Sequence, residues 1–496
     1  GMETEVQSTT SLRTRNRGSR AVAVWNVLGR IDGTDPSGAI LLMAHYDPVP
    51  RSSGASDAGT GVAAILEAVR ALRQGSAPEN DIVVLLSDAE ELGLMGARAF
   101  VDGHRWATEI SIVLNFEMRG HRGASMMFET GPENGWAVRQ WAEADPHPVG
   151  SSVSLAVYRS MPNDTDFSPF RDRGIQGLNF GAIEGGNLYH LALDDLNHNS
   201  PETLQHQGIQ ALAMARHLGD IDLTETHAPD LAFARVGLFG LIVHPPTWNW
   251  IGVALSVILA LTALFLGLRT GTFRLKGLAA GLGLATVSLL TAALLGWALF
   301  RGAQGFHPEY GRLAGSSFHR EGWYFLTVLV LSLSLLLRFM GWGRRRFHLS
   351  ELAWGAALLP LGVAVVLPWL APLAALNIVW PVLFGEMALL LFLLRVEGQV
   401  GDGWRRGRST LGLGLLLMPV IFLLVPGVEM LWEAMSISFA PVLAAFGTLT
   451  AILILPLLAP LQRPNRWWAP VFLEALALLS LGMGLSHASP GPDTPT

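Results

Sequence analysis

The chain has 496 residues, a net charge of −6 and no cysteine, which excludes disulfide bonds and every thiolate metal site. Any metal ligand must therefore be His, Asp or Glu. Residues 1–245 contain 18 Lys and Arg against 30 Asp and Glu, whereas the remainder contains 16 against 10 and long apolar runs. This division indicates a soluble acidic domain followed by a membrane domain. The acidic surface argues against a nucleic acid partner, because phosphate binding needs a basic face.

The N-terminal half is predicted to be an α/β domain. Residues 1–20 form a polar segment with no apolar run and no signal peptide. Across 21–230, short apolar runs alternate with amphipathic stretches, and several runs are apolar on both faces, as in buried parallel strands. This alternation predicts an α/β sandwich with a largely parallel central sheet. The predicted strands are 21–27, 39–44, 82–87, 110–116, 125–129 and 177–181, and the predicted helices are 61–72, 94–101, 135–144 and 201–217.

The C-terminal half is predicted to be a helical membrane domain. Residues 231–246 are mixed in composition and are interpreted as a connector. Residues 247–487 are predicted to hold about eight transmembrane helices, each near the ~20 residues that a bilayer requires, and 488–496 form a polar tail. The predicted spans are 248–268, 277–299, 322–341, 351–370, 374–394, 410–428, 437–459 and 468–486.

Basic residues gather in alternate loops of this predicted bundle. The odd-numbered loops hold most of its arginines and Lys276, so the positive-inside rule places these loops in the cytoplasm. The α/β domain and the C-terminus are then extracytoplasmic. A folded domain of this size needs an upstream segment to deliver it across the membrane. We therefore expect the natural protein to have an N-terminal signal anchor before Gly1.

Two candidate metal ligands lie early in the α/β domain. His45 ends a predicted strand, and Asp47 can accept its other ring proton, which would fix the tautomer. Taken alone, His45 could equally be an ordinary surface histidine. Asp57 precedes the helix 61–72 among glycines that permit close backbone approach. An N-cap would also explain Asp57, but the crowded setting favours a carboxylate that bridges two metal ions.

Acids also follow two later strands. Glu90 and Glu91 are adjacent in a loop, where their side chains diverge. Glu91 is interpreted as a ligand and Glu90 as a general base, because metal-bound water has a pKa near ~7 and needs only a modest base. Glu117 ends the strand 110–116 and is interpreted as a terminal ligand, the alternative being a first solvated residue.

The last candidates surround residue 190. Tyr189 can donate a hydrogen bond to the oxyanion of a tetrahedral intermediate. His190 is predicted to bind metal, and Asp194 and Asp195 are candidates for orienting it. Weaker candidates for lining the cleft, which a loop or a helix cap explains equally well, are Tyr158, Arg159, Asp164 and Asp166.

Together these residues predict a site for two divalent ions. One ion would be held by His45, Asp57 and either Glu117 or Glu91. The other would be held by Asp57, His190 and the remaining acid. The shared Asp57 would keep the ions ~3.5–4 Å apart, as in two-metal hydrolytic sites.

This ordered set resembles the M28 family of zinc aminopeptidases over about residues 20–220. The resemblance rests on the His45–Asp47 pair, Asp57, the Glu90–Glu91 pair, the later acid and the Tyr189–His190 pair. It implies a three-layer α/β zinc-peptidase domain with a mostly parallel mixed sheet. It also implies that two Zn²⁺ ions are bound, one by His45, Asp57 and Glu117 and the other by Asp57, Glu91 and His190. Glu90 would be the base, and Tyr189 would stabilise the intermediate. Glu117 departs from the pattern, because many members have Asp there.

An M28 domain followed by a multispan membrane domain is similar to the endoplasmic reticulum metallopeptidase 1 type and its bacterial relatives, which carry an N-terminal membrane anchor. The predicted function is therefore a membrane-anchored dizinc aminopeptidase that acts on peptides outside the cytoplasm. A bacterial inner membrane is the expected location. The expected partners are a peptide substrate and the lipid bilayer, and the oligomeric state is left open.

Two other functions remain open at this point. A glutaminyl-cyclase-type enzyme shares the fold but uses one metal, whereas His45 beside Asp57 favours two. The other is a peptide-binding ectodomain on a transporter-like or scaffold membrane domain, because acids inside a membrane are functional candidates. The acids in question are Glu386, Glu429, Glu433 and Glu474.

Overall fold

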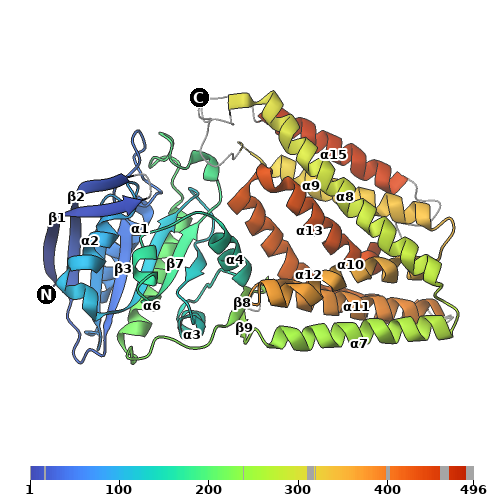
Figure 1. Ribbon diagram of the computed structural model, residues 1–496, viewed down its shortest axis with the longest axis horizontal. Helices are drawn as coiled ribbons and strands as arrows, with labels where there is room; N and C mark the ends of the chain where they lie inside the picture. The colour runs from blue at the N-terminus through green and yellow to red at the C-terminus, as the bar shows by residue number, and fades with distance from the viewer. Residues whose placement is uncertain are drawn as a thin grey trace. The chain divides into compact units, whose positions relative to one another are not determined.

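The computed structural model describes residues 2–15, 18–237, 240–309, 318, 320–397, 403–458 and 468–487. It divides into two compact units, of which the first ends at Pro245 and the second begins at Pro246. The first unit is α/β and the second is all-helical (Figure 1). The predicted polar tail, 488–496, lies outside the described residues.

A mixed sheet forms the centre of the first unit. Within the described residues it has seven strands in the order β1-β2-β4-β3-β5-β7-β6. The four central strands β4, β3, β5 and β7 are parallel neighbours, whereas β1, β2 and β6 join antiparallel at the edges. The sheet is therefore parallel at its centre, as predicted, with antiparallel borders. The bounds are β1 (Glu3–Arg15), β2 (Gly18–Ile31), β3 (Ala39–His45), β4 (Asp81–Ser87), β5 (Ile110–Met118), β6 (Met126–Thr130) and β7 (Gln176–Ala182).

Helices cover both faces of this sheet and give three layers. α1 and α6 pack together on one face, and α3 lies against α6. On the other face, α2 and α5 share an apolar cluster with Leu41, Met43 and Val83 of the sheet. β3, β4 and β7 are buried along their whole length, which explains why their sequences are apolar on both faces. The helices are α1 (Gly59–Leu72), α2 (Met95–Gly103), α3 (Gly135–Ala144), α4 (Ser152–Ser160), α5 (Ser168–Arg171) and α6 (Pro201–Gly219), with short 3-10 turns η1 (Arg105–Glu109) and η2 (Gly186–Leu188).

Two segments are more ordered than their composition indicates. The polar segment 1–20 contains β1 and the start of β2, which form an antiparallel hairpin at the edge of the sheet. β1 exposes Val6 and Leu12 and buries Ser11, so it carries no alternating apolar pattern that would reveal a strand. The predicted connector 231–246 likewise contains a hairpin of β8 (Ala232–Arg235) and β9 (Leu241–His244).

The second unit is a bundle of apolar helices. Of its described residues, seven helices are long and apolar enough to cross a membrane. The predicted span 437–459 is the exception. There the chain forms a shorter helix, α13 (Ala440–Leu453), and a turn of helix, α14 (Leu455–Leu458). Pro456 follows the break and has no N–H to continue the hydrogen-bond ladder. The long helices are α7 (Trp248–Arg269), α8 (Leu275–Phe306), α9 (Gly322–Gly343), α10 (Leu349–Leu370), α11 (Leu376–Glu397), α12 (Gly403–Met435) and α15 (Trp468–His487).

Candidate metal centre

Four of the candidate side chains come from the carboxyl ends of parallel strands. His45 is the last residue of β3, and Glu117 is the penultimate residue of β5. Glu90 and Glu91 lie in the loop that follows β4. Because β4, β3 and β5 are parallel neighbours, these ends meet at one edge of the sheet, where α/β proteins place their ligand sites.

Asp57 lies between two histidines. It arrives from the loop before α1, and His190 follows η2. Asp57 Oδ1 is 3.2 Å from His45 Nε2, and Asp57 Oδ2 is 3.2 Å from His190 Nε2. The Asp57 side chain is only 6% exposed. One buried carboxylate thus presents a separate oxygen to each imidazole, which is the geometry that a bridging ligand requires.

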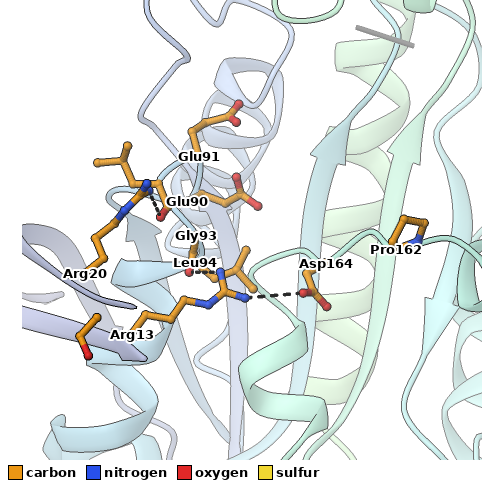
Figure 2. A pocket seen from close by; sticks show the side chains of 10 residues that line it. Arg13, Arg20, Glu90, Glu91, Gly93, Leu94, Pro162 and Asp164 are labelled. Atoms are coloured by element: carbon orange, nitrogen blue, oxygen red, sulfur yellow. Dashed lines mark hydrogen bonds and ion pairs between the residues drawn. The ribbon is translucent and has the colours of Figure 1, made fainter. Parts of the chain in front are cut away.

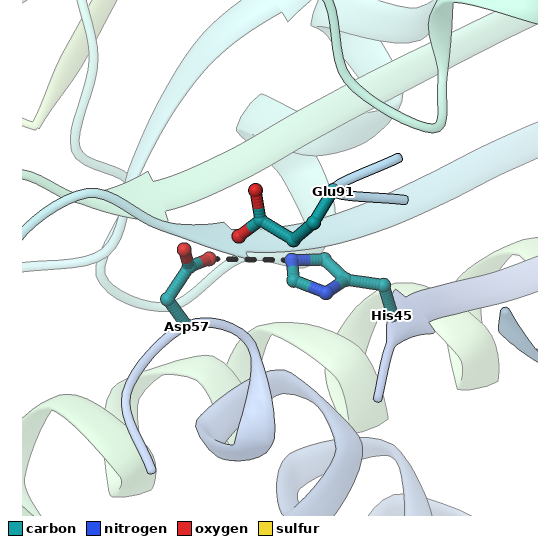
Figure 3. A group of neighbouring side chains, drawn as sticks. All are labelled: His45, Asp57 and Glu91. Atoms are coloured by element: carbon teal, nitrogen blue, oxygen red, sulfur yellow. Dashed lines mark hydrogen bonds and ion pairs between the residues drawn. The ribbon is translucent and has the colours of Figure 1, made fainter. Parts of the chain in front are cut away.

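Each histidine also faces one glutamate. Glu117 Oε2 is 3.5 Å from His45 Nε2, and Glu91 Oε1 is 2.9 Å from His190 Nε2. Glu91 also approaches the other half of the cluster, because one ligand atom each from His45, Asp57 and Glu91 lie within 4.8 Å of one another (Figure 3). We group Glu91 with His190, the imidazole that it contacts directly. The structure therefore brings together all five candidate ligands.

Asp47 supports the site differently from the expected way. His45 Nδ1 bonds to the backbone carbonyl of Asp47 at 2.9 Å, whereas the Asp47 carboxylate is 3.7 Å away. That carboxylate instead accepts the backbone N–H groups of Glu90 at 2.9 Å and of Glu91 at 3.2 Å. The expectation that the carboxylate of Asp47 takes the ring proton is thus corrected. Asp47 fixes His45 through its backbone and the Glu90–Glu91 loop through its side chain.

Asp194 and Asp195 do not orient His190, which corrects a second expectation. The Asp194 carboxylate accepts the backbone N–H groups of Ser56 at 2.7 Å and of Asp57 at 3.3 Å. Asp195 instead bonds to His198 at 2.8 Å. Asp194 therefore holds the loop that carries Asp57. The contact joins positions far apart in the chain, so no local sequence pattern could reveal it.

Two further contacts fix ligand orientation. Asn115 Nδ2 donates to Glu117 Oε1 at 3.1 Å, which leaves Oε2 directed at His45. The Tyr189 ring stacks on the His190 ring, with centroids 3.7 Å apart and an interplanar angle of 21°. Tyr189 thus supports the imidazole as well as offering the phenol that the sequence singled out.

Backbone conformations at the site are unusual. Ala89 and His190 have φ values of 56° and 62°, in the left-handed region that residues other than glycine rarely adopt. Ala89 directly precedes Glu90, and His190 is itself a candidate ligand. Such conformations persist where the surrounding structure enforces them, and they cluster at functional sites. The peptide bond between Asp57 and Ala58 is cis.

The histidines are surrounded by negative charge. Burial lowers the pKa of His45, but the neighbouring carboxylates of Asp47, Asp57 and Glu117 outweigh this effect and raise the pKa well above its ordinary value. Burial also lowers the pKa of His190, but Asp57 and Glu91 outweigh this effect and raise the pKa to about 9. Metal ligation needs the deprotonated imidazole. A cation bound between these carboxylates would balance their negative charge, which the protonated imidazole rings otherwise balance.

Glu90 has the properties of a proton-transfer group. Burial raises the pKa of its carboxyl well above the ordinary value. His45 opposes this effect, whereas repulsion from Glu117, Asp166 and Glu91 adds to it. A carboxyl group that takes up and releases a proton closer to neutral pH suits general acid–base catalysis. A bound cation nearby would moderate this shift.

The donor set fits zinc. Imidazole nitrogens and carboxylate oxygens are ligands that zinc takes in proteins. His190 Nε2 is buried and makes no hydrogen bond to any described residue, although two carboxylate oxygens lie 2.9 and 3.2 Å away. The nitrogen therefore faces the space between the two acids rather than forming an N–H···O bond with either. Converging buried carboxylates are costly unless paired or bound to a cation, so His45, Asp57, Glu91, Glu117 and His190 suit a metal centre.

Asp166 belongs to the site more clearly than its sequence context indicated. It is fully buried, and its Oδ2 accepts a hydrogen bond from Ser87 Oγ at the end of β4. Burial raises its pKa to about 7. Its other oxygen has no hydrogen-bond partner among the described residues. Of the other weak candidates, Asp164 lines the cavity described below, Tyr158 packs edge-on against Phe128, and Arg159 is exposed.

A cavity of about 540 Å³ opens beside the Glu90–Glu91 loop (Figure 2). Asp164 and the N-terminal hairpin, which contributes Arg13 and Arg20, also line it, and Arg13 Nη2 lies 3.8 Å from Asp164 Oδ2. This space adjoins both the proposed base and a candidate ligand, so a substrate bound in the cavity would lie next to the metal centre.

The two arginines also hold the loop that follows Glu91. Arg13 Nη1 donates to the carbonyl of Gly93 at 2.9 Å, and Arg20 Nη1 donates to the carbonyl of Leu92 at 2.9 Å. The hairpin therefore takes part in shaping the cavity. Sequence reasoning missed this role, because nothing in a polar segment shows which distant loop it will contact.

The domain that carries this site is similar to known proteins. Residues 26–215 match the model of Peptidase family M28. The chain is 33% identical over 284 residues to endoplasmic reticulum metallopeptidase 1 of Homo sapiens. This alignment covers 54% of this chain and 31% of that protein. The chain is also 27% identical over 249 residues to a vacuolar membrane protease of Vanderwaltozyma polyspora, which covers 49% of this chain and 26% of that protein.

Among solved structures, a zinc aminopeptidase from Bacillus subtilis is 22% identical, with a TM-score of 0.32. That alignment covers 43% of this chain and 55% of the other. The chain spans about a third or less of the length of the curated relatives named above.

Proposed function

We propose that this protein, whose residues 26–215 form a peptidase family M28 domain, is a membrane-anchored zinc metallopeptidase that removes N-terminal residues from peptides. The observation that carries the proposal is the position of Asp57, which presents one carboxylate oxygen to each of two histidines. A site for a single ion needs no such division. The proposed cofactor is therefore a pair of zinc ions.

Each ion would have its own histidine and glutamate. His45, Glu117 and Asp57 Oδ1 would hold one, and His190, Glu91 and Asp57 Oδ2 would hold the other. When bound, the two ions would polarise the scissile carbonyl and make the attacking water molecule more acidic. The spacing of the residues supports this division, because each histidine lies within 3.5 Å of its own glutamate.

Glu90 would move the proton during hydrolysis. Its backbone is held by Asp47, and its side chain borders the cavity. The carboxylate would take a proton from the attacking water and pass it to the leaving amine. The same carboxyl can play both parts because its surroundings raise its pKa towards neutrality.

Tyr189 would stabilise charge that develops on the substrate oxygen. Its ring is fixed by stacking on His190, which keeps the phenol beside the metal centre. Burial, reinforced by the surrounding carboxylates, raises the pKa of Tyr189, so the phenol stays protonated and can donate a hydrogen bond to an oxyanion.

The second unit would anchor the peptidase domain in a membrane. Seven helices among its described residues have the length and composition of membrane spans. From the distribution of basic residues, we propose that the peptidase domain and the C-terminus face away from the cytoplasm, in a bacterial inner membrane. The substrates would then be extracytoplasmic peptides.

Metal analysis and peptidase assays of the purified full chain test this function. We expect about two zinc ions per chain and hydrolysis of aminoacyl anilides that stops on chelation and returns with zinc. One zinc per chain, with cyclisation of N-terminal glutaminyl peptides, would instead support a glutaminyl-cyclase-type enzyme. A chain that binds no zinc and hydrolyses none of these substrates would refute the proposal.

A further inference from the structure

Among the described residues, an acidic side chain without an ion-pair partner lies in the middle of the helical bundle. Glu386 of α11 is 1% exposed. Neither of its carboxylate oxygens has a hydrogen-bond partner among the residues that the structure describes. Buried polar groups are nearly always hydrogen-bonded, so such an exception needs an explanation.

The position of Glu386 in its helix makes the lack of a hydrogen-bond partner more unusual. Glu386 lies near the centre of the apolar stretch Leu376–Leu394 of α11, which is long enough to cross a membrane. In a helix that spans a hydrocarbon core of ~30 Å, this position is close to the midplane. An ionised carboxylate is costly there, and ionisable residues at such depth mark proton or ion pathways more often than structure.

The neighbouring helix α7 packs against α11 (Figure 1). A side-chain atom added at Gly252 would come within 2.5 Å of Val379 of α11, so the two backbones approach closely here. Ser256, one turn further along α7, is fully buried and interacts with Glu386. A hydroxyl group thus faces the carboxyl group across this contact.

Ser256 differs from most hydroxyl residues of the bundle. Thr262, Thr286 and Thr448 each donate to the backbone carbonyl four residues earlier in their own helix. Ser256 makes no such bond, and its oxygen has no hydrogen-bond partner among the described residues. Its hydroxyl is therefore available to Glu386.

Two other acids of the bundle are paired with arginine. Glu351 accepts hydrogen bonds from Arg274, and Glu474 accepts them from Arg338. No basic side chain in the described part of the bundle makes an ion pair with Glu386. A bound proton would then neutralise the negative charge of this carboxyl group.

We propose that α7 and α11 enclose an intramembrane proton-binding site in which Glu386 carries the proton and Ser256 Oγ is its hydrogen-bond partner. This inference is independent of the peptidase activity, because it concerns the second unit alone. It assigns that unit a role beyond anchoring, since a proton-binding group at mid-membrane is the element that couples proton movement to a change in a membrane protein.

Labelling with a hydrophobic carbodiimide tests the protonation of Glu386. The reagent reacts with a carboxylic acid: the carboxyl proton passes to a carbodiimide nitrogen while the carboxyl oxygen bonds to its central carbon, and no other reactant is needed. The full chain, reconstituted in liposomes at neutral pH, is treated and digested, and adducts are located by mass spectrometry. We expect about one adduct per chain, in the peptide that contains Glu386. A water-soluble carbodiimide should leave this peptide unmodified.

Variants distinguish labelling at Glu386 from labelling of carboxyl groups in general. Glu386→Gln should lose the adduct, whereas Glu474→Gln, which removes an acid paired with Arg338, should keep it. Ser256→Ala should change the rate of labelling at Glu386 and nowhere else. Mapping the adduct in the unsubstituted chain keeps the test decisive if a variant fails to fold. The absence of label at Glu386, or its suppression by sodium ions, would overturn the assignment of a proton site.

Discussion

The two units differ in how their buried acidic side chains are arranged. In the first unit, Asp57, Glu91 and Glu117 converge within a few ångströms and share two histidines. In the helical unit, Glu386 is alone in an apolar layer, with one hydroxyl beside it. The first arrangement concentrates negative charge, and the second isolates a single group.

This difference follows from the donors available in each unit. The ends of the parallel strands supply loops whose backbone N–H groups and imidazoles can hold several carboxylates together. In the middle of a spanning helix, every backbone group is committed to the helix. A cluster of acids can therefore be built at the edge of the sheet to attract cations, whereas an acid inside the bundle must be paired or carry a proton. The predictions below test this contrast.

The largest effect is expected from Asp57→Asn. The variant removes the charge shared by both halves of the cluster, so zinc content should fall from about two ions to less than one per chain. Hydrolysis of aminoacyl anilides should fall by at least the ~10²–10⁴-fold that a general base contributes. Elemental analysis and initial rates measure both quantities. Asp195→Asn, at a partly exposed carboxylate that bonds to His198, is the matched control. Retention of both ions by Asp57→Asn would contradict a bridging role.

Glu90→Gln should abolish proton transfer while leaving the cluster intact. We expect kcat to fall by ~10²–10⁴-fold, with zinc content unchanged. Steady-state kinetics and elemental analysis of the same preparation test both halves of this statement. Glu67→Gln, on the exposed surface of α1, is the control acid. A variant with parental kcat would remove Glu90 from the mechanism, and one that loses zinc would make it a ligand.

A smaller loss is expected from Asp47→Asn. An amide has one oxygen, so it can no longer accept both the Glu90 and Glu91 N–H groups. Groups that orient metal ligands typically contribute ~10–100-fold to metal affinity or activity. Competition with a chromophoric chelator measures the affinity, and kcat/KM measures the activity. If zinc affinity stays at the parental value, Asp47 does not position Glu91.

The clustering of the five candidate ligands could be predicted from the sequence because each is a polar residue beside a strand end or a glycine-rich loop. His45, Glu117 and the Glu90–Glu91 pair directly end or follow buried apolar runs, so their clustering follows from a parallel sheet. The supporting residues could not be predicted in the same way. Asp194 reaches the Asp57 loop across more than a hundred residues, and the choice between the side chain and the carbonyl of Asp47 depends on the exact turn.

The same reasoning explains the differences in the fold. β1 is an edge strand with little buried surface, so it lacks the alternation that identifies a strand. The length of α13 is set by a break at Ile454, which an average over ~20 apolar residues does not detect. Strands and helices that are determined by burial leave an apolar pattern in the sequence. Features that depend on a single contact or a local helix break leave no such pattern.

In the helical unit, Glu351→Gln and Glu386→Gln should differ in their effect on stability. Glu351 accepts hydrogen bonds from the Arg274 side chain at 2.8 Å and from the His348 backbone at 3.0 Å. Losing a charged acceptor of this kind lowers the free energy of unfolding by about 1.5–3 kcal/mol. Glu386 accepts no bond from a basic side chain or a backbone N–H among the described residues, and a Gln amide can still bond to Ser256. Its replacement should therefore leave the midpoint of thermal unfolding in detergent close to the parental value. Equal destabilisation by the two substitutions would mean that Glu386 has a structural partner.

The smallest effect concerns the hairpin that borders the cavity. The Glu5 carboxylate accepts hydrogen bonds from His104 and, at 2.9 Å, from Arg105. The bond from His104 is the main cause of a lowered pKa for Glu5, and burial opposes it. Because the pKa of Glu5 is lower in the folded state, its contribution is present above the ordinary value of 4.5 and is lost as pH falls through the folded value.

Since Glu5 is partly exposed, this contribution should be below about 1 kcal/mol. The difference in unfolding midpoint between the parent and Glu5→Gln should therefore be small at about pH 7 and should shrink further as the pH falls below about 4. Glu79→Gln, an exposed acid away from the hairpin, should show no such trend. A difference that grew on acidification would mean that Glu5 is more easily protonated in the folded chain, and the hairpin would then not be held by this ion pair.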